Sequence, residues 1–562
     1  MQIPDYAELH CLSCFSFMRG ASHPEELAAT AAALGYRALA ITDECSLAGV
    51  VRAHREIRNR QLPLHLIIGS ELRVHDGPTL ILLARSRRGY AQLSHLISSA
   101  RRAAAKGTYS LGRDAFTADA VDDCLALLLP PDDYSAGLAQ AHWLAGRFPS
   151  RCWLAAPTHG PRLASRHHQL ATLAAASALP VAAASGVLMH DASRREVADT
   201  LCAIRLRTPL AQCGYALAAN GERRLHTRAE LGRRVPAAWL AETLKVAAAC
   251  TFTLDELRYE YPAGLVPAGE TAARWLRRLV EGGLQWRYHT PAGAVFPPPP
   301  GPPGRPPPCA DPAPPPVRTL IEDELALISE LGYEPYFLTV YDIVAFARAA
   351  GILCQGRGSA AHSAVCWALG ITEVHPEQGI MLFERFISRE RQEPPDIDVD
   401  FEHERREEVI QYLYRKYGRE HAALAAAVIT WRTRSALRDV GRPLGIDAAR
   451  IERLCAERVS IDDGHVDAGR LHAAGLDPQS PLVCRWLALS ATLRGFPRHL
   501  SQHVGGFVIA RGRIDELVPV ENAAMDGRTV IQWDKDDLDT MGLLKVDVLA
   551  LGMLSALRRC LD

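Results

Sequence analysis

Lysine is scarce in this chain of 562 residues. Lysine and arginine together number 63, and only five of these are lysines (positions 106, 245, 416, 535 and 545), which leaves 58 arginines. In a chain that uses arginine for nearly all of its basic residues, a lysine at a given position indicates a chemical requirement for lysine there. The scarcity therefore marks Lys545, which lies in an apolar segment beside an aspartate, as a candidate functional residue.

Long hydrophobic runs are also missing. None approaches the roughly 20 residues that a membrane-spanning helix needs, and the first residues lack the charged-then-apolar pattern of a signal peptide. These absences argue against a membrane protein and favour a cytoplasmic location. With 48% hydrophobic residues and a formal net charge of −1, the composition indicates a globular protein of two or more domains.

Paired cysteine motifs are nearly absent as well. Of the 14 cysteines, only Cys11 and Cys14 have Cys-x-x-Cys spacing, and no second pair completes a zinc site. The cysteines are therefore expected to be reduced thiols in the core. A large net charge is missing too, which neither indicates nor excludes nucleic-acid binding, because a basic groove can lie beside acidic surfaces.

The first quarter of the chain alternates between predicted strands and helices. Residues 38–41 and 66–71 are apolar runs of strand length, and a helix is expected between them at about 46–60. Strands separated by helices predict a parallel sheet or barrel, in which polar groups at the carboxyl ends of the strands form the site. The candidates at such ends are His10, Asp43 and Glu71.

Two further regions carry less information. Residues from about 195 to 290 show a helical pattern without recognisable chemistry. A proline-rich run follows at 295–317, which cannot pack a core and is predicted to be an extended linker or surface insertion. It is either a passive insertion or a proline motif that binds a partner protein.

The stretch 394–401 carries the strongest chemical pattern. Apolar residues and aspartates alternate with a period of two, which on a β-strand sends Ile397, Val399 and Phe401 to one face and the acids to the other. Those acids are Asp396, Asp398 and Asp400. Carboxylates two residues apart lie roughly 7 Å apart at the backbone, so they can converge on the paired divalent cations of polymerases and nucleases. The alternative is a solvated acidic edge strand.

A second apolar strand is predicted at 542–549, where Lys545 and Asp547 share one face. Asp547 would add a third carboxylate to the metal site, and Lys545 would neutralise a triphosphate or its leaving group. The preceding segment, 498–506, is expected to be a connector into this sheet with its glycines as the turn.

A glycine-rich loop follows the apolar segment 352–354 and precedes a helix of small residues. The loop consists of Gly356, Arg357, Gly358 and Ser359. Backbone N–H groups, the positive end of the following helix and Arg357 would together bind phosphate. The spacing matches neither the Walker nor the dinucleotide motif, so a plain glycine turn is the alternative. Arg385, just before the aspartate strand, suits the same metal-assisted phosphoryl transfer from a nucleoside triphosphate.

Residues 429–458 are rich in arginine. Backbone contact with DNA, independent of sequence, is one interpretation, and a solvated helix face is the other. The DNA-binding candidates are Arg432, Arg434, Arg438 and Arg442.

The first region resembles the polymerase-and-histidinol-phosphatase (PHP) domain, a distorted β/α barrel that can hold a multi-metal phosphoesterase centre. The matching segments are 8–11, 41–43, 69–71 and 185–190. The family's opening His-x-His is replaced by His10-Cys11-Leu12, and its late Asp-x-His by Gly186-Val187-Leu188. Leucine offers no lone pair to a metal, so a structural barrel with hydrogen-bonded remnants is expected rather than an active phosphoesterase.

Nearly the whole chain, apart from the proline-rich run, resembles the N-terminal half of a bacterial C-family DNA polymerase, of the replicative alpha-subunit type, and its error-prone, damage-associated branch in particular. The segments that carry this resemblance are 351–359, 382–386, 394–401, 498–506, 532–536 and 542–552. The resemblance implies that Asp398, Asp400 and Asp547 hold two catalytic Mg²⁺ ions. It also implies that Gly358, Ser359 and Lys545 contact the incoming nucleotide, in a palm similar to that of the polymerase-beta nucleotidyltransferases.

The implied fold is a multidomain α/β protein. Its parts are a barrel with a degenerate metal site at 1–258, the first part of the palm at 259–428 with the insertion at 295–317, a helical thumb at 429–499, and the second part of the palm at 500–562. The family's fingers, helix-hairpin-helix module, clamp-binding segment and oligonucleotide-binding fold are not expected in this chain.

The implied function is DNA-directed DNA synthesis of the error-prone type, in damage-induced mutagenesis and translesion synthesis. Its partners would be primer-template DNA and deoxynucleoside triphosphates, with other mutagenesis proteins and the sliding clamp as further partners, and no membrane. Two alternatives stay open: a truncated, non-catalytic fragment that binds DNA or partner proteins, and a metal-dependent phosphoesterase that acts from the barrel.

Overall fold

The computed structural model describes residues 3–75, 77–117, 119–262, 264–289, 313–378, 397–456, 459–461 and 465–562. Arg385, Asp396 and most of the proline-rich run lie outside the described residues. The chain divides into two compact units. The first unit comprises residues 1–257, 426–501 and 515–526, and the second comprises 258–425, 502–514 and 527–562.

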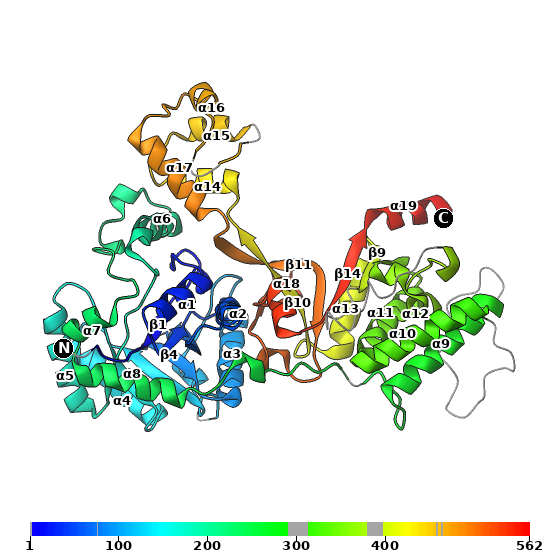
Figure 1. The fold of residues 1–562 in the computed structure, drawn as a ribbon, viewed down its shortest axis with the longest axis horizontal. Helices are drawn as coiled ribbons and strands as arrows, with labels where there is room; N and C mark the ends of the chain where they lie inside the picture. Colours follow the sequence, from blue (N-terminus) through cyan, green and yellow to red (C-terminus); the bar gives the residue numbers. More distant parts are fainter. Residues whose placement is uncertain are drawn as a thin grey trace. The chain divides into compact units, whose positions relative to one another are not determined.

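The first unit is built on a barrel-like sheet of seven strands in the order β1-β2-β3-β4-β5-β6-β7 (Figure 1). Their bounds are Ala7–Cys11, Ala38–Ile41, His65–Arg73, Thr79–Ala84, Cys124–Leu129, Cys152–Ala156 and Val181–Ala183. Only β4 runs antiparallel to its neighbours. Val187 then forms a parallel bridge with Cys11, which brings the segment after β7 back to β1. The predicted barrel is confirmed.

Helices surround this sheet, and small and branched residues fill its interior, including Leu9, Ile67, Leu83 and Leu127. The helices are α1 (Pro24–Ala33), α2 (Val50–Arg60), α3 (Arg87–Arg102), α4 (Tyr134–Arg147), α5 (Leu163–Ser177), α6 (Arg195–Leu206), α7 (Arg228–Arg234) and α8 (Ala237–Ala249). The helix expected at 46–60 begins only at Val50. The barrel therefore has an apolar interior, and its polar side chains lie at the ends of the strands.

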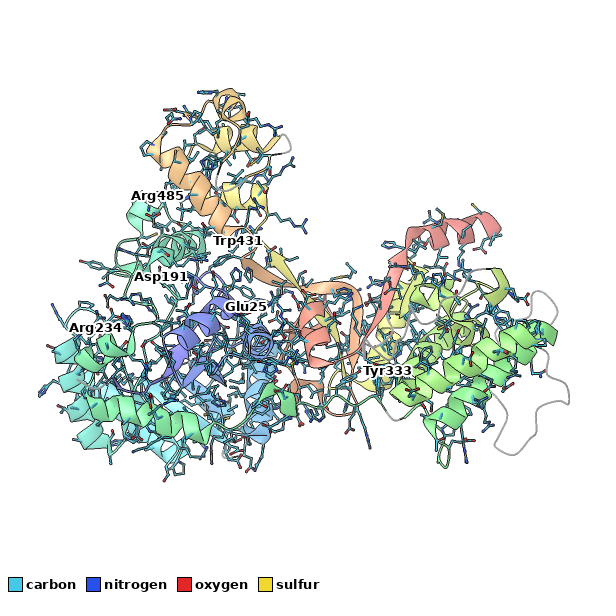
Figure 2. The ribbon with its side chains drawn as sticks, in the orientation of Figure 1. Glu25, Asp191, Arg234, Tyr333, Trp431 and Arg485 are labelled. Atoms are coloured by element: carbon cyan, nitrogen blue, oxygen red, sulfur yellow. The ribbon has the colours of Figure 1, made fainter. Side chains whose placement is uncertain are left out.

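A helical segment in the first unit lies between β10 (Ala422–Thr430) and β11 (Pro497–Ile509). The described helices are α14 (Thr433–Gly441), α15 (Ala448–Ala456), α16 (Ala468–Ala473) and α17 (Pro481–Leu493). They have a core of their own, in which the buried Trp486 donates from Nε1 to the Leu437 carbonyl at 2.9 Å. Trp431, labelled in Figure 2, is buried at the base of the segment and donates to Asp439 Oδ2 at 2.9 Å.

The second unit contains the strands that carry the acidic motif. The second sheet includes β13 (Thr529–Ile531), β10, β11, β14 (Lys545–Leu551), β9 (Ile397–Glu402) and β8 (Cys354–Gly358), in that order. Strand β9 pairs in parallel with β14 and antiparallel with β8. The helices of this unit are α9 (Ala272–His289), α10 (Pro315–Leu331), α11 (Glu334–Ala349), α12 (Ala364–Ala368), α13 (Arg406–Tyr417), α18 (Lys535–Met541) and α19 (Gly552–Leu561).

Two expectations about local structure are wrong. The proline-rich run was expected to stay extended to residue 317, but α10 begins at Pro315, because the fixed φ of proline suits the first turn of a helix. The segment 498–506 was expected to be a connector with a glycine turn, but it lies within the continuous strand β11. A Cβ on Gly505 would lie 2.3 Å from the Val548 carbonyl oxygen, so glycine here permits close approach of strands and not a turn.

Two adjacent glycines of α9 provide a test of this packing. A Cβ on Gly283 would lie 1.9 Å from the Ala368 carbonyl oxygen, whereas one on Gly282 would meet nothing within 4 Å. We expect Gly283→Ala to destabilise the second unit by about 1–3 kcal/mol, because backbone cannot move aside cheaply. Gly282→Ala should stabilise it by up to about 1 kcal/mol through helix propensity. Urea unfolding followed by circular dichroism measures both, and equal effects of the two substitutions would contradict the α9–α12 contact.

Candidate active site

Strand register brings the predicted carboxylates together. In the parallel pair, Asp547 of β14 lies opposite Asp398 of β9. On the other side of β9, Arg357 of β8 lies opposite Asp398. The Arg357 side chain reaches both acids of β9, with NH1 at 3.3 Å from Asp398 Oδ2 and Nε at 2.9 Å from Asp400 Oδ2. Asp398 and Asp400 therefore project to one face, as the period of two predicts.

Asp547 is the most enclosed of the three acids. It is 5% exposed, and its Oδ2 accepts from the Lys545 ammonium. Its Oδ1 is buried and has no hydrogen-bond partner among the described residues. Burial raises the pKa of Asp547, but the Lys545 charge and hydrogen bond, with contributions from Asp398 and His503, outweigh burial and leave the pKa below its ordinary value. The carboxylate is therefore ionised at neutral pH.

Glycine 506 makes room for this arrangement. It lies opposite Asp547 in the antiparallel pair of β11 with β14. A Cβ at this position would lie 3.0 Å from Asp547 Oδ1 and 3.3 Å from the Lys545 side chain. The Gly506 N–H donates to His503 Nδ1 at 2.7 Å. The glycines of β11 are thus part of the site, a role that the sequence pattern did not reveal.

The glycine-rich segment was predicted to be a loop, but Gly356, Arg357 and Gly358 lie in strand β8, so it differs in part from the predicted phosphate cradle. Gly358 has φ +63°, a conformation that favours glycine, and a Cβ there would lie 3.8 Å from Asp398 Oδ2. The Gly356 N–H is already used, because it donates to the Ile371 carbonyl at 2.7 Å. Arg357 is half-exposed but paired with the β9 aspartates. This segment therefore presents the Arg357 guanidinium to Asp398 and Asp400.

The N-terminus of α12, which was expected to attract phosphate, already holds a carboxylate. Glu324 of α10 is buried and accepts from the Ser363 hydroxyl at 2.7 Å and from the N–H groups of Ala364 and Val365 at 2.8 and 2.9 Å. Burial raises the pKa of Glu324 to about 7, although these hydrogen bonds oppose the shift. Glu324 lies 40 residues from Ala364 in the chain, so no local pattern indicated it.

The donor atoms suit a hard divalent cation, since carboxylate oxygens are the ligands that Mg²⁺ prefers. The unpartnered Asp547 Oδ1 fits this chemistry. In the described part of the chain, however, no group of three His, Cys, Asp or Glu side chains is arranged to hold a metal. Arg357 and Lys545 hold carboxylate oxygens that such an ion would need.

A basic groove lies in the first unit between α6 and the helical segment. Its volume is about 730 Å³, and its arginines are Arg205, Arg207, Arg442 and Arg498. Of the DNA-binding candidates only Arg442 lines this groove, whereas Arg438 makes hydrogen bonds of 2.6–3.2 Å to Glu452. Arg432 precedes α14 as its N-cap. Arg205 and Arg207 come from a region that showed no chemistry in the sequence, because isolated arginines on a helix give no signal.

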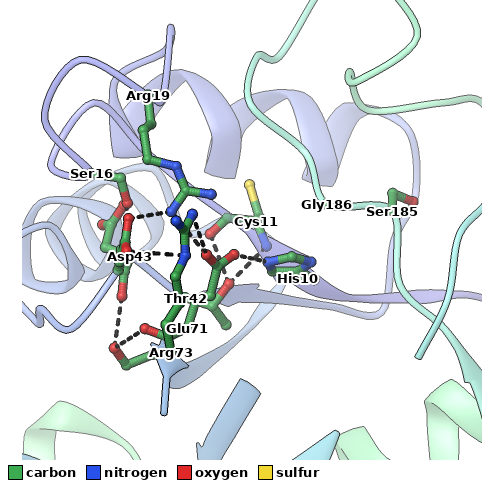
Figure 3. A network of polar contacts seen from close by, with 12 residues as sticks. His10, Cys11, Ser16, Arg19, Thr42, Asp43, Glu71, Arg73, Ser185 and Gly186 are labelled. Carbon is green, nitrogen blue, oxygen red and sulfur yellow. Dashed lines mark hydrogen bonds and ion pairs between the residues drawn. The ribbon is translucent and has the colours of Figure 1, made fainter. Parts of the chain in front are cut away.

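At the mouth of the barrel, the candidate ligands form a hydrogen-bonded network (Figure 3). His10 Nε2 lies 2.8 Å from Glu71 Oε2. Arg19 donates to Glu71 at 2.8 Å and also to Glu44. The oxygens of Asp43 accept from the Ser13 N–H and from the hydroxyls of Ser13 and Ser16 at 2.7–2.8 Å. His10, Asp43 and Glu71 are thus bonded to protein groups.

Comparisons with known proteins match both regions. The PHP domain family matches residues 8–144, and the family described as the bacterial DNA polymerase III alpha NTPase domain matches residues 274–550. A solved structure described as a metal-dependent phosphoesterase from Bifidobacterium adolescentis covers 33% of this chain and 88% of its own, with 16% identity and a TM-score of 0.26. That likeness is too low to support any argument.

The curated relatives match nearly the whole chain. An error-prone DNA polymerase of Aromatoleum aromaticum is 63% identical over 561 residues, which are 99% of this chain and 51% of that protein. A second, of Dechloromonas aromatica, is 57% identical over 567 residues, which are 100% of this chain and 53% of that protein. The chain spans about half the length of the curated relatives it matches. No helix in the described residues is long and apolar enough to cross a membrane.

The aspartate strands β9 and β14 carry their acids within the matched polymerase domain, and the barrel strands β2 to β5 lie within the matched PHP domain. This chain belongs to the bacterial DNA polymerase III alpha family.

Proposed function

We propose that the chain carries the nucleotidyl-transfer centre of an error-prone, DNA-directed DNA polymerase. In the proposed reaction the primer 3′-hydroxyl attacks the α-phosphate of a deoxynucleoside triphosphate, and pyrophosphate leaves. The observation that carries the proposal is the register of β9 with β14, which sets Asp398 opposite Asp547 beside an unpartnered Oδ1. The names of the relatives support the type of polymerase.

The proposed ligands of two Mg²⁺ ions are Asp398, Asp400 and Asp547. When bound there, Mg²⁺ would stabilise the charge on the attacking and leaving oxygens. Lys545 keeps Asp547 ionised, because its ammonium lowers the pKa of that carboxyl against the effect of burial. Three carboxylates face the two cations Arg357 and Lys545, so the centre keeps a negative charge that favours a cation.

Nucleotide binding is proposed for the glycine-rich segment and for two basic residues elsewhere in the chain. The residues are Gly356, Arg357, Gly358, Ser359, Arg385 and Lys545. Arg357 is the main candidate, since its side chain is 51% exposed and can turn from the aspartates to a triphosphate. Arginine forms bidentate bonds with phosphate, which also fixes its orientation.

Primer-template DNA is proposed to lie along the arginine-lined groove and the thumb, which we assign to residues 429–499 between palm segments 259–428 and 500–562. Translesion synthesis during damage-induced mutagenesis is the proposed role, with other mutagenesis proteins and the sliding clamp as partners of the whole polymerase. Bacterial DNA lies in the cytoplasm, which is the proposed location.

A second function is a non-catalytic scaffold that binds DNA or polymerase partners. The pairing of Arg357 with both β9 aspartates favours it, because each ion pair must open before a metal ion binds. If the chain is a polymerase, removal of an active-site carboxylate abolishes nucleotide transfer. If it is a scaffold, there is no transfer to abolish, and only binding can change.

Primer extension with Mg²⁺ on a primed template distinguishes them. We expect extension by the purified chain, and we expect Asp398→Asn and Asp547→Asn each to reduce its rate on the order of a hundredfold or more, because the metal ligands act on the transition state. The matched control is Glu404→Gln, which removes an exposed carboxylate just after β9 and should leave the rate unchanged. Extension that survives both aspartate substitutions would refute the assignment of the site, and DNA binding without any extension would favour the scaffold.

Arg357→Gln tests the proposed turn of the guanidinium toward the nucleotide. We expect the KM for deoxynucleotide to rise about tenfold, as loss of a charge-assisted bidentate contact predicts, with little change in the Kd for primer-template DNA. Steady-state kinetics and fluorescence anisotropy measure the two constants. A lower KM in this variant would mean that Arg357 only obstructs the site.

Arg442 and Arg438 form a matched pair for the DNA groove. Arg442 lines the groove, whereas the charge of Arg438 is neutralised by Glu452. We expect Arg442→Ala to weaken DNA binding and to reduce the slope of log affinity against log salt by about one. Arg438→Ala should change both less. Equal effects in anisotropy titrations over a range of salt concentrations would show that the groove is not the DNA path.

A further inference from the structure

The mouth of the barrel contains a cavity that the polymerase centre does not use. Its volume is about 530 Å³. Side chains from β1 and β3 and from the segments after β5, β6 and β7 line it, which is the end of a β/α barrel where sites are formed. All of the described lining residues belong to the first unit.

The charge of this cavity is positive. The described residues that line it include four arginines, Arg19, Arg73, Arg166 and Arg223, and only one carboxylate, Glu71. Glu44 adds a second carboxylate, since it pairs with Arg19 and lies 3.3 Å from Arg73. Asp132 adds a third, since its Oδ1 lies 3.4 Å from Arg166 NH1. Three acids therefore face four guanidiniums. The imidazole of His159 adds no charge at neutral pH, because burial and the neighbouring Arg223 lower its pKa to about 4.

Arg223 is the cation with the least compensation. Its Nε donates to the Gly186 carbonyl at 2.9 Å. No carboxylate among the described residues lies within 4 Å of its guanidinium to form an ion pair. Burial and the nearby Arg19 together lower the pKa of Arg223 to about 10 against the opposing effect of Glu71, so the group is still charged at neutral pH. A largely desolvated guanidinium without an acid is costly unless an anion balances it.

A buried imidazole nitrogen lies beside the same guanidinium. His10 is 3% exposed and lines the cavity, and its Nδ1 has no partner among the described residues. A Cβ on Gly186 would lie 3.2 Å from Arg223 NH2 and 3.3 Å from His10 Nδ1. Because residue 186 is a glycine, with φ +59°, no side chain fills the space next to Arg223 NH2 and His10 Nδ1. A buried polar atom without a partner, in such a space, indicates a missing ligand.

This space does not suit a cation. Leu12 and Leu188 offer no lone pairs, Asp43 has its oxygens saturated by Ser13 and Ser16, and guanidinium groups repel a metal ion. The negative charge of Glu71 is already compensated by its neighbours. Burial raises the pKa of Glu71, but His10 and Arg19 outweigh burial and hold that pKa well below its ordinary value. The excess positive charge of the cavity therefore favours an anion as its ligand.

We propose that the mouth of the barrel binds a phosphate group, held by the guanidiniums of Arg223 and Arg73 with His10 Nδ1 as a further partner, and that it binds without hydrolysing its ligand. Guanidinium forks match phosphate oxygens in pairs. A protonated phosphate oxygen, present near neutral pH because the second pKa of phosphate is about 6, can donate to His10 Nδ1. The cavity is larger than one phosphate, so the group is either free inorganic phosphate or the terminal phosphate of a DNA strand.

Calorimetric titration of the full chain tests the site with three probes: inorganic phosphate, a single-stranded oligonucleotide with a 5′-phosphate, and the same oligonucleotide without it. We expect Arg223→Gln to weaken phosphate binding at least tenfold. Arg73→Gln should weaken it several-fold, and its side chain is 56% exposed, so this substitution does not disturb the core. The control Arg60→Gln changes an exposed arginine of α2 outside the cavity and should have no effect.

The oligonucleotides identify the source of the phosphate. A 5′-phosphate that strengthens binding in the wild type but not in Arg223→Gln would assign the site to strand ends. An effect of Arg223→Gln on inorganic phosphate alone would assign it to the free anion. Equal phosphate affinities of the wild type and both cavity variants, each shown to be folded by circular dichroism, would overturn the proposal. Hydrolysis of p-nitrophenyl phosphate with Mn²⁺ that depends on Arg223 would overturn the non-hydrolytic part.

Discussion

The parallel pairing of β9 with β14 is the constraint on which the candidate active site depends. Side chains alternate between the faces of a strand, so a slip of one residue would carry Asp547 away from Asp398 and Asp400. The register is secured on both sides, because β8 pairs with β9 and β11 pairs with β14. Gly505 and Gly506 let β11 approach β14 closely enough to hold that register while leaving space for Asp547 Oδ1.

Residual charge distinguishes the two polar centres. In the second unit, Asp398, Asp400 and Asp547 face Arg357 and Lys545, which leaves an uncompensated negative charge. In the barrel, four arginines face Glu71, Glu44 and Asp132, which leaves an excess of positive charge. Both centres use arginine as a counterion for carboxylates, yet their residual charges have opposite signs.

The mobility of the counterions follows from their exposure. The Arg357 side chain is half-exposed, and an ion pair with so much solvent around it contributes at most about 1 kcal/mol, so its exchange from aspartate to triphosphate costs little. The barrel pair of His10 with Glu71 is almost fully enclosed, with 4% of each side chain exposed. Breaking one partner of such a buried pair costs several kcal/mol. The candidate active site is therefore suited to exchange of ions, and the barrel network to a fixed geometry.

Local patterns in the sequence predicted the elements of the fold well. Alternation with a period of two identified β9 and β14, and apolar runs identified β2 and β3. The patterns failed where a distant residue decides the outcome. Arg438 and Arg442 look alike in sequence, but only Arg438 meets Glu452. The N-terminus of α12 looked available for phosphate until Glu324 was placed against it from α10. Likewise, the glycines of β11 signalled a turn, because sequence cannot distinguish bending of the chain from close approach of another strand.

The scarcity of lysine has a structural counterpart at position 545. The Lys545 side chain is 9% exposed and pairs with Asp547 two residues further along the same strand. A carbon of its stem lies 3.3 Å from the position that a Cβ on Gly506 would take, so β11 closes over it. An ammonium is compact and forms its bond to Asp547 within this space. A guanidinium is planar and wider and brings five N–H donors, and the Asp547 Oδ2 that Lys545 occupies could not satisfy all of them in a buried position. In a chain with 58 arginines, packing against β11 therefore explains why this cation is a lysine.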